Sequence, residues 1–126
     1  MRKLVLLTTV MLTLTGLVIT YVDMLAMVVD WRKWVALLHI WAGVLFLVIF
    51  TLYAWDHISM NRHWLRIFSP VTITGVLQTM AAVVMILSGV VLLLYGEASW
   101  PTLRGFHHWL TYVLALSILT HYLSRK

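Results

Sequence analysis

The sequence of 126 residues contains no cysteine. It therefore cannot form disulfides, thiolate metal sites or cofactor links through thioether bonds. Charged residues are scarce as well, because Asp, Glu, Lys and Arg make up only 10% of the chain while 63% of it is hydrophobic. A water-soluble domain of this size could not bury that much apolar surface. The composition predicts an integral membrane protein in contact with the lipid bilayer.

Four apolar segments without internal charges make up most of the chain. Each is close to the ~20 residues that a helix needs to cross a hydrocarbon layer of ~30 Å. We predict membrane-spanning helices at about 4–22, 34–55, 75–96 and 106–123. The first segment also has the pattern of a signal peptide, but no small-x-small cleavage site precedes Asp23, so we expect a retained helix. The predicted fold is an all-α, four-helix transmembrane bundle that forms one domain.

The basic residues stand at the ends of the apolar segments and do not form one patch. The net charge of +5 therefore indicates membrane topology and excludes a nucleic-acid partner. More lysine and arginine lies on the side of the two termini than on the opposite side, which places both termini in the cytoplasm. The first group is Arg2, Lys3, Arg62, Arg66, Arg125 and Lys126, and the second is Arg32, Lys33 and Arg104.

Histidine is the notable polar residue of the predicted spans, which contain no Asp, Glu, Lys or Arg. An imidazole in hydrocarbon is costly unless it is paired, so an intramembrane histidine is a candidate functional residue. His39 and His121 lie several residues inside their segments, whereas His63 lies beyond the second span and is expected to be solvated. The others could be interfacial rings, and any of them could hydrogen-bond to Ser or Thr on another helix. The six histidines are His39, His57, His63, His107, His108 and His121.

Helical spacing places two histidines on one face of the second span and two on one face of the fourth. His39 and His57 are 18 residues apart, which is about five turns and ~27 Å along the axis. His107 and His121 are 14 residues apart, about 40° short of four turns and ~21 Å along the axis. His108 would diverge from His121 by roughly 140°, so His107 is preferred and His108 is the fallback.

The second and fourth spans run in the same direction across the membrane. We therefore predict that His39 lies level with His107, and His57 level with His121. The two halves of the chain also share short motifs, because Thr15-Gly16 in the first segment resembles Ser88-Gly89 in the third. The resemblance predicts an internal repeat, although alignment of the last histidine of each half requires a gap of four residues.

Two facing imidazoles in a dry interior favour haem iron, which takes axial nitrogen ligands from opposite sides. Zinc or copper would usually recruit three or four ligands, and a proton relay would include acidic residues in the spans. Gly43, one turn after His39 on the same face, could leave room for a flat ring, and so could Gly16 and Gly89. Close helix packing is the alternative explanation for these glycines. Arg32 and Arg104 stand near the outer histidine pair and could bind propionates.

The segment Trp34-x4-His39-x-Trp41-x-Gly43, followed by His57-Ile-Ser-x-Asn61-x-x-Trp64, resembles the small di-haem membrane cytochromes b. Their superfamily includes the gamma subunits of formate dehydrogenase and respiratory nitrate reductase. The resemblance covers all four predicted spans. It implies two b-type haems that pass electrons between a periplasmic redox partner and quinone or another acceptor, in the cytoplasmic membrane of a bacterium. By position it implies His39, His57, His107 and His121 as axial ligands, and it implies work inside a larger redox complex. The larger members have a fifth helix and soluble parts that this sequence lacks.

A cofactor-free structural or assembly subunit is the rival interpretation. In such a protein the histidines would be satisfied by hydrogen bonds to neighbouring helices. No residues that transform a substrate are visible in the sequence, so both interpretations place any catalysis in a partner subunit. A visible spectrum that responds to reduction separates the two.

Overall fold

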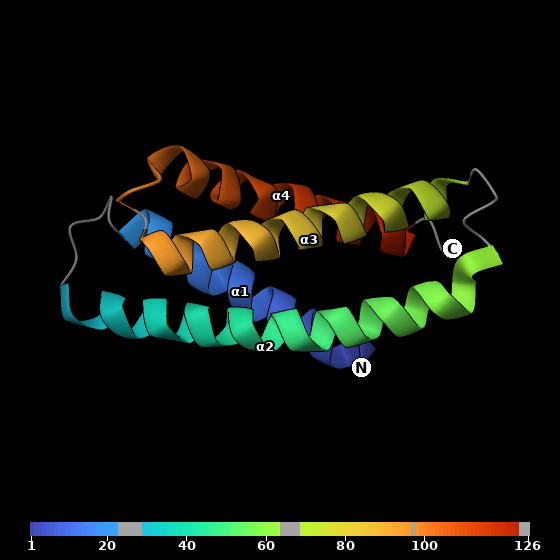
Figure 1. Cartoon of the computed structure of the whole chain (residues 1–126), viewed down its shortest axis with the longest axis horizontal. Coiled ribbons are helices and arrows are strands. Elements are labelled where there is room, and N and C mark those ends of the chain that lie inside the picture. The colour runs from blue at the N-terminus through green and yellow to red at the C-terminus, as the bar shows by residue number, and fades with distance from the viewer. Residues whose placement is uncertain (23–28, 64–68, 97, 124–126) are drawn as a thin grey trace. The chain divides into compact units, whose positions relative to one another are not determined.

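The chain is described by a computed structural model that covers residues 1–22, 29–63, 69–96 and 98–123 (Figure 1). Within these ranges there are four α-helices, which confirms the predicted all-α class. Five of the residues named above (Asp23, Trp64, Arg66, Arg125 and Lys126) lie outside the described residues. The helices are α1 (Arg2–Val22), α2 (Val29–Asn61), α3 (Pro70–Tyr95) and α4 (Pro101–Leu123).

Three of the four described helices are long and apolar enough to cross a membrane. The qualifying stretches are Arg2–Tyr21, Trp31–Asn61 and Pro70–Tyr95. The 23 residues of α4 would reach ~34 Å at ~1.5 Å per residue. Its three imidazoles and several hydroxyl groups lower its hydropathy, and it does not qualify by the same measure. These three helices thus support a membrane protein.

The helices extend beyond the predicted spans. α2 begins at Val29 instead of 34 and ends at Asn61 instead of 55, so its 33 residues reach ~50 Å. A charged residue such as Asp56 marks the end of an apolar segment, but it does not interrupt the backbone hydrogen bonds of a helix. In the last turn of α2 the Asn61 side chain donates a hydrogen bond to the carbonyl of His57 at 2.8 Å.

α3 begins at Pro70, earlier than predicted, because the sequence Ser69-Pro70 forms a helix start. Ser69 is the N-cap residue, and its hydroxyl accepts a hydrogen bond from the Thr72 backbone N–H at 3.2 Å. Proline suits the first helical position because the N–H that it lacks would have no partner within the helix.

Ser69→Ala is expected to destabilise the amino-terminal turn of α3, because the Thr72 N–H loses its acceptor. Loss of an N-cap hydroxyl costs about 1 kcal/mol. The measurement is the free energy of unfolding of the full chain in mixed micelles. Ser69→Asn keeps an N-cap acceptor and should retain nearly all of the stability. An equal loss in both variants would contradict the capping role.

The chain divides into two compact units, Met1–Trp55 and Asp56–Lys126. The first contains α1 and most of α2, and the second contains α3 and α4, which lie side by side (Figure 1). In the second unit, Ser88 contacts His107 and Thr74 contacts His121. A step of 14 residues forward along α3 therefore matches a step of 14 back along α4, so the two helices pack in an antiparallel register.

We call α1 with α2 the first hairpin and α3 with α4 the second hairpin. The middle of the second hairpin is filled by small and medium apolar side chains. Ala81 and Leu114 lie midway between the two histidine contacts in this register, and they are 7% and 6% exposed. Ala82 is completely buried. Small residues let two helices approach closely, as helix pairs in membranes commonly do. Seven-residue steps between the contacts are also the spacing of left-handed helix packing.

The first hairpin follows the same plan. Thr15 contacts His39 across the pair of helices. Seven residues earlier on α1 is Thr8, and seven residues later on α2 is Phe46, and both are buried. Phe46 also stacks on Phe50, with ring centroids 5.1 Å apart. The two hairpins thus have equivalent first contacts and different central side chains.

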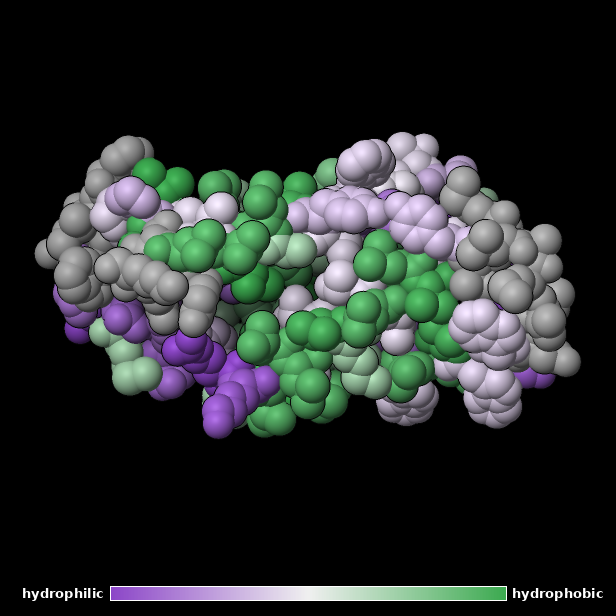
Figure 2. All heavy atoms as spheres, turned by 180° about the vertical axis from the view of Figure 1, so that it is seen from behind, coloured by the Kyte–Doolittle hydropathy of each residue, from purple (hydrophilic) through white to green (hydrophobic). Residues whose placement is uncertain are grey.

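Many large apolar side chains of all four helices are exposed, among them Trp41 and Leu94 at 70%. Figure 2 shows hydrophobic side chains over much of the visible surface. Exposed apolar surface on this scale is a liability in water. It suits a chain whose helices contact lipid.

Candidate histidine sites

His39 of α2 is held by two neighbouring residues of α1. Its Nδ1 atom lies 2.8 Å from the hydroxyl oxygen of Thr15, which is buried. Gly16 lies against the same edge of the ring, because a Cβ atom at position 16 would be 3.2 Å from Cε1 of His39. Any residue other than glycine would require the ring to shift by a few tenths of an ångström. The missing Cβ of Gly16 thus leaves room for the imidazole, and its role as space for a flat ligand stays a prediction.

His107 of α4 has the same surroundings on α3. Its Nδ1 atom lies 2.7 Å from the hydroxyl of Ser88, which is 4% exposed. A Cβ atom at Gly89 would lie 3.3 Å from Cε1 of His107. The predicted similarity between Thr15-Gly16 and Ser88-Gly89 therefore extends to their contacts.

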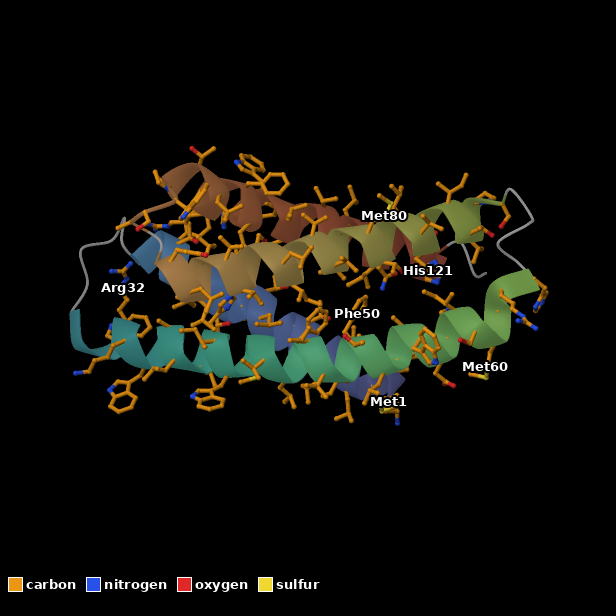
Figure 3. The ribbon with its side chains drawn as sticks, in the orientation of Figure 1. Met1, Arg32, Phe50, Met60, Met80 and His121 are labelled. Carbon is orange, nitrogen blue, oxygen red and sulfur yellow. The ribbon has the colours of Figure 1, made fainter. Side chains whose placement is uncertain are left out.

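His121, near the end of α4, has the third such site (Figure 3). Its Nδ1 atom lies 3.1 Å from the hydroxyl of Thr74. A Cβ atom at Gly75 would lie 3.3 Å from Cε1 of His121 and 3.6 Å from Nδ1. Sequence reasoning did not single out Thr74-Gly75. The pair precedes Ser88-Gly89 by 14 residues, and the same spacing separates His107 from His121. These equal spacings could have indicated from the sequence that Thr74-Gly75 meets His121.

We call each of these pairs a hydroxyl–glycine cradle. In every cradle the hydroxyl residue contacts Nδ1, and a Cβ atom on the glycine that follows it would crowd Cε1, so both residues lie along the same edge of the ring. The cradles are Thr15-Gly16 for His39, Ser88-Gly89 for His107 and Thr74-Gly75 for His121.

The hydrogen bonds of the hydroxyls indicate which ring nitrogen carries the proton. Each hydroxyl donates to a carbonyl of its own helix: Thr15 to Met11 at 2.8 Å, Ser88 to Met85 at 3.0 Å and Thr74 to Pro70 at 2.8 Å. A hydroxyl has one proton to donate, and when that proton goes to the carbonyl its oxygen can only accept from the imidazole. We infer that Nδ1 carries the proton in all three rings and that Nε2 carries the lone pair.

The other three histidines differ from this pattern. His108 contacts the Tyr112 hydroxyl of its own helix through Nε2 at 3.3 Å, and the two rings meet edge to face. His57 is half-buried in the last turns of α2, and His63 is exposed after the helix ends. In the antiparallel register of the first hairpin, a second step of seven beyond Phe46 reaches Tyr53. Counting in steps of seven thus reaches Tyr53 and not His57, which accounts for the gap of four residues, and the role of His57 stays a prediction.

The remaining predicted site residues lie close to the cradles along the chain. Gly43 is near Leu12, whose Cδ2 atom would be 3.9 Å from a Cβ at this position, an ordinary contact distance. Arg32 extends from the first turn of α2 and is half-buried (Figure 3). Arg104 is exposed in the first turn of α4, three residues before His107. Each arginine therefore precedes a cradled histidine by one or two helical turns.

Clusters of three or more His, Asp or Glu side chains that could hold a metal ion do not occur among the described residues. His39 belongs to the first unit, whereas His57, His107 and His121 belong to the second. The pairing of histidines across α2 and α4 therefore stays a prediction from the sequence. No protein-family model, curated protein or solved structure matches the chain, so the cradles are interpreted from their own geometry.

Proposed function

We propose that the chain is a b-type membrane cytochrome in which cradled histidines bind haem iron and which passes single electrons across the bilayer. His39, His107 and His121 are the proposed ligands with cradles, and His57 is the fourth proposed ligand from the sequence. Two haems, one near each membrane surface, would be held by these four residues. The proposed partners are a periplasmic redox protein and quinone or another acceptor, within a larger complex.

The observation that carries the proposal is the repeated contact of Nδ1 with a hydroxyl oxygen. A histidine that binds a metal through Nε2 commonly donates its Nδ1–H to a second group, which fixes the tautomer and the ring orientation. With Nδ1 protonated, as inferred above, the three cradles match this arrangement and the lone pair is on Nε2, the nitrogen that a metal would use. The donor set therefore fits haem iron, which needs two axial nitrogen atoms and no acidic ligand.

The histidine positions fit transfer across a membrane. His107 and His121 are on one helix, separated by ~21 Å along its axis, a large part of the ~30 Å hydrocarbon layer. Between them Ala81, Ala82 and Leu114 are buried and exclude water. Haem iron, when bound, supplies a one-electron couple. Arg32 and Arg104 would pair with propionates at the outer end.

The proposal includes a fourth span at α4. Its length suffices to cross the bilayer. Two of the three imidazoles that reduce its hydropathy, those of His107 and His121, contact α3. Both termini then lie on one side, which the distribution of lysine and arginine places in the cytoplasm.

A cofactor-free subunit of a membrane complex is the second candidate. The same three hydrogen bonds favour it, since each satisfies a polar ring in an apolar setting. Such a role, however, places no demand on which ring nitrogen meets the hydroxyl. Contact through Nδ1 in all three cases is common for metal-binding histidines and therefore favours the haem proposal.

The proposal is tested by the visible absorption of the full chain, purified in mild detergent from cells supplied with a haem precursor. Bis-histidine haem gives sharp bands on reduction with dithionite, and the pyridine haemochrome assay should give about two haems per chain. A colourless chain that is folded by circular dichroism would refute the proposal and favour the second candidate. An equally coloured fraction from an unrelated four-helix membrane protein would show that the colour is non-specific.

A further inference from the structure

The hydroxyl–glycine cradles do more than satisfy the histidines. A histidine ring that only needs a partner can turn about its Cβ–Cγ bond and accept or donate through either nitrogen. In the cradles the hydroxyl determines which nitrogen points to the neighbouring helix. The glycine allows the ring edge to approach to a distance at which a Cβ atom would be crowded. Together they leave one orientation of the ring.

We propose that Thr15-Gly16, Thr74-Gly75 and Ser88-Gly89 are positioning residues that hold each imidazole as its Nδ1–H tautomer and lower the reduction potential of the iron it binds. The positioning half of the inference stands on the contacts alone. The half that concerns the potential rests on the proposed haem binding.

The direction of the effect on the potential follows from charge. An Nδ1–H group that donates to a hydroxyl oxygen makes Nε2 a more basic ligand, because electron density moves towards the iron. A more basic ligand stabilises the ferric state over the ferrous state, so the potential falls. Removal of the acceptor should therefore make the potential more positive.

Ser88 is the sharpest position for a test, since its hydroxyl is 2.7 Å from Nδ1 of His107. Ser88→Ala removes the oxygen and little volume. Ser117→Ala is the matched control, because Ser117 is also buried and its hydroxyl donates to the carbonyl of Leu114 in its own helix. Ser88→Thr keeps a hydroxyl and should restore the wild-type behaviour. On α3, Thr79→Val is a second control for Thr74→Val, because the Thr79 hydroxyl bonds to the Gly75 carbonyl.

Two measurements on the full chain as purified test the positioning role and the effect on the reduction potential. The first is nuclear magnetic resonance of ¹⁵N-histidine protein, reduced so that any haem iron is diamagnetic, which reports the protonated nitrogen of each ring. We expect Nδ1–H signals from His39, His107 and His121, and loss or displacement of the His107 signal in Ser88→Ala but not in Ser117→Ala. The second is a spectroscopic redox titration, in which one midpoint should move to a more positive value in Ser88→Ala and return in Ser88→Thr.

The outcomes separate this inference from the proposed function. If haem is bound and Ser88→Ala changes neither the Nδ1–H signals nor a midpoint relative to Ser117→Ala, the inference is wrong and the function stands. If no haem is bound, the function and the effect on the potential are both wrong, and the Nδ1–H signals alone decide the positioning role. Should Ser88→Ala fail to fold, Thr74→Val against Thr79→Val gives the same comparison at His121.

Discussion

His107→Ala is expected to abolish the spectrum of one haem, whereas His108→Ala should leave both haems in place. The two residues are neighbours in sequence, so they share depth and composition of surroundings. Their contacts differ: His107 meets Ser88 and Gly89 of the neighbouring helix, and His108 meets Tyr112 of its own. The first arrangement is the one typical of a metal-binding histidine, whose Nδ1 meets a second group on a neighbouring element. Loss of an axial ligand should release the haem or leave it five-coordinate, without the sharp low-spin bands.

The measurement is haem content per chain together with the reduced-minus-oxidised spectrum of each purified variant. His121→Ala should remove the other haem, so the double variant of His107 and His121 should bind none. His39→Ala should act on the same haem as His107→Ala if the sequence-based pairing is right. If haem were lost in His108→Ala alone, His108 would be the ligand. Equal haem content in all variants would show that these histidines do not bind the haem iron.

The helices were predictable because a membrane span requires a long uncharged apolar segment, and nothing else in the sequence resembles one. The ends of the helices were harder to predict. The first charge after an apolar segment indicates where the hydrocarbon layer stops, whereas the helix stops where its backbone loses its partners. For this reason α2 continues past Asp56 to Asn61. The start of α3 was visible in Ser69-Pro70, a local signal that an apolar count overlooks.

The fourth helix shows the opposite problem. His107 and His121, the candidate functional residues of α4, also reduce its hydropathy. The residues that indicate a function therefore make the span harder to predict. A histidine held by a neighbouring helix does not face lipid, and a scale based on composition assigns it the full cost of exposure. The sequence therefore predicts the helix better than it predicts the span.

The candidate sites were predictable as residues but not as contacts. The even spacing of His107 and His121 placed them on one face of a helix, and that inference needs only helical geometry. Which helix that face meets, and which ring nitrogen meets it, depends on the register of α3 against α4. The second occurrence of a hydroxyl–glycine pair at Thr74-Gly75 fixes that register, because each pair can meet only one histidine at a time. The register can be predicted when the spacings on α3 and α4 are compared, whereas the spacing on one helix alone does not predict it.

Gly89→Val is the second large expected effect, and it separates space for the ring from the hydrogen bond. Even the Cβ atom of alanine would lie 3.3 Å from Cε1 of His107, and valine adds two methyl groups to it. Ser88 remains in place, but the ring has to leave its position. We expect loss of the haem that His107→Ala removes. Overpacking of this kind also destabilises a helix pair by about 1–3 kcal/mol.

Gly105→Val is the matched control, since it makes the same change on a helix where a Cβ atom would meet nothing within 4 Å. Both variants replace a helical glycine with valine, so their effects on the helix backbone are alike, and only Gly89→Val displaces an imidazole. Haem content, the reduced spectrum and the free energy of unfolding should all fall in Gly89→Val and stay near wild type in Gly105→Val. If Gly89→Val were destabilised but kept both haems with unchanged spectra, the glycine would serve helix packing alone, and the cradle would consist only of its hydroxyl.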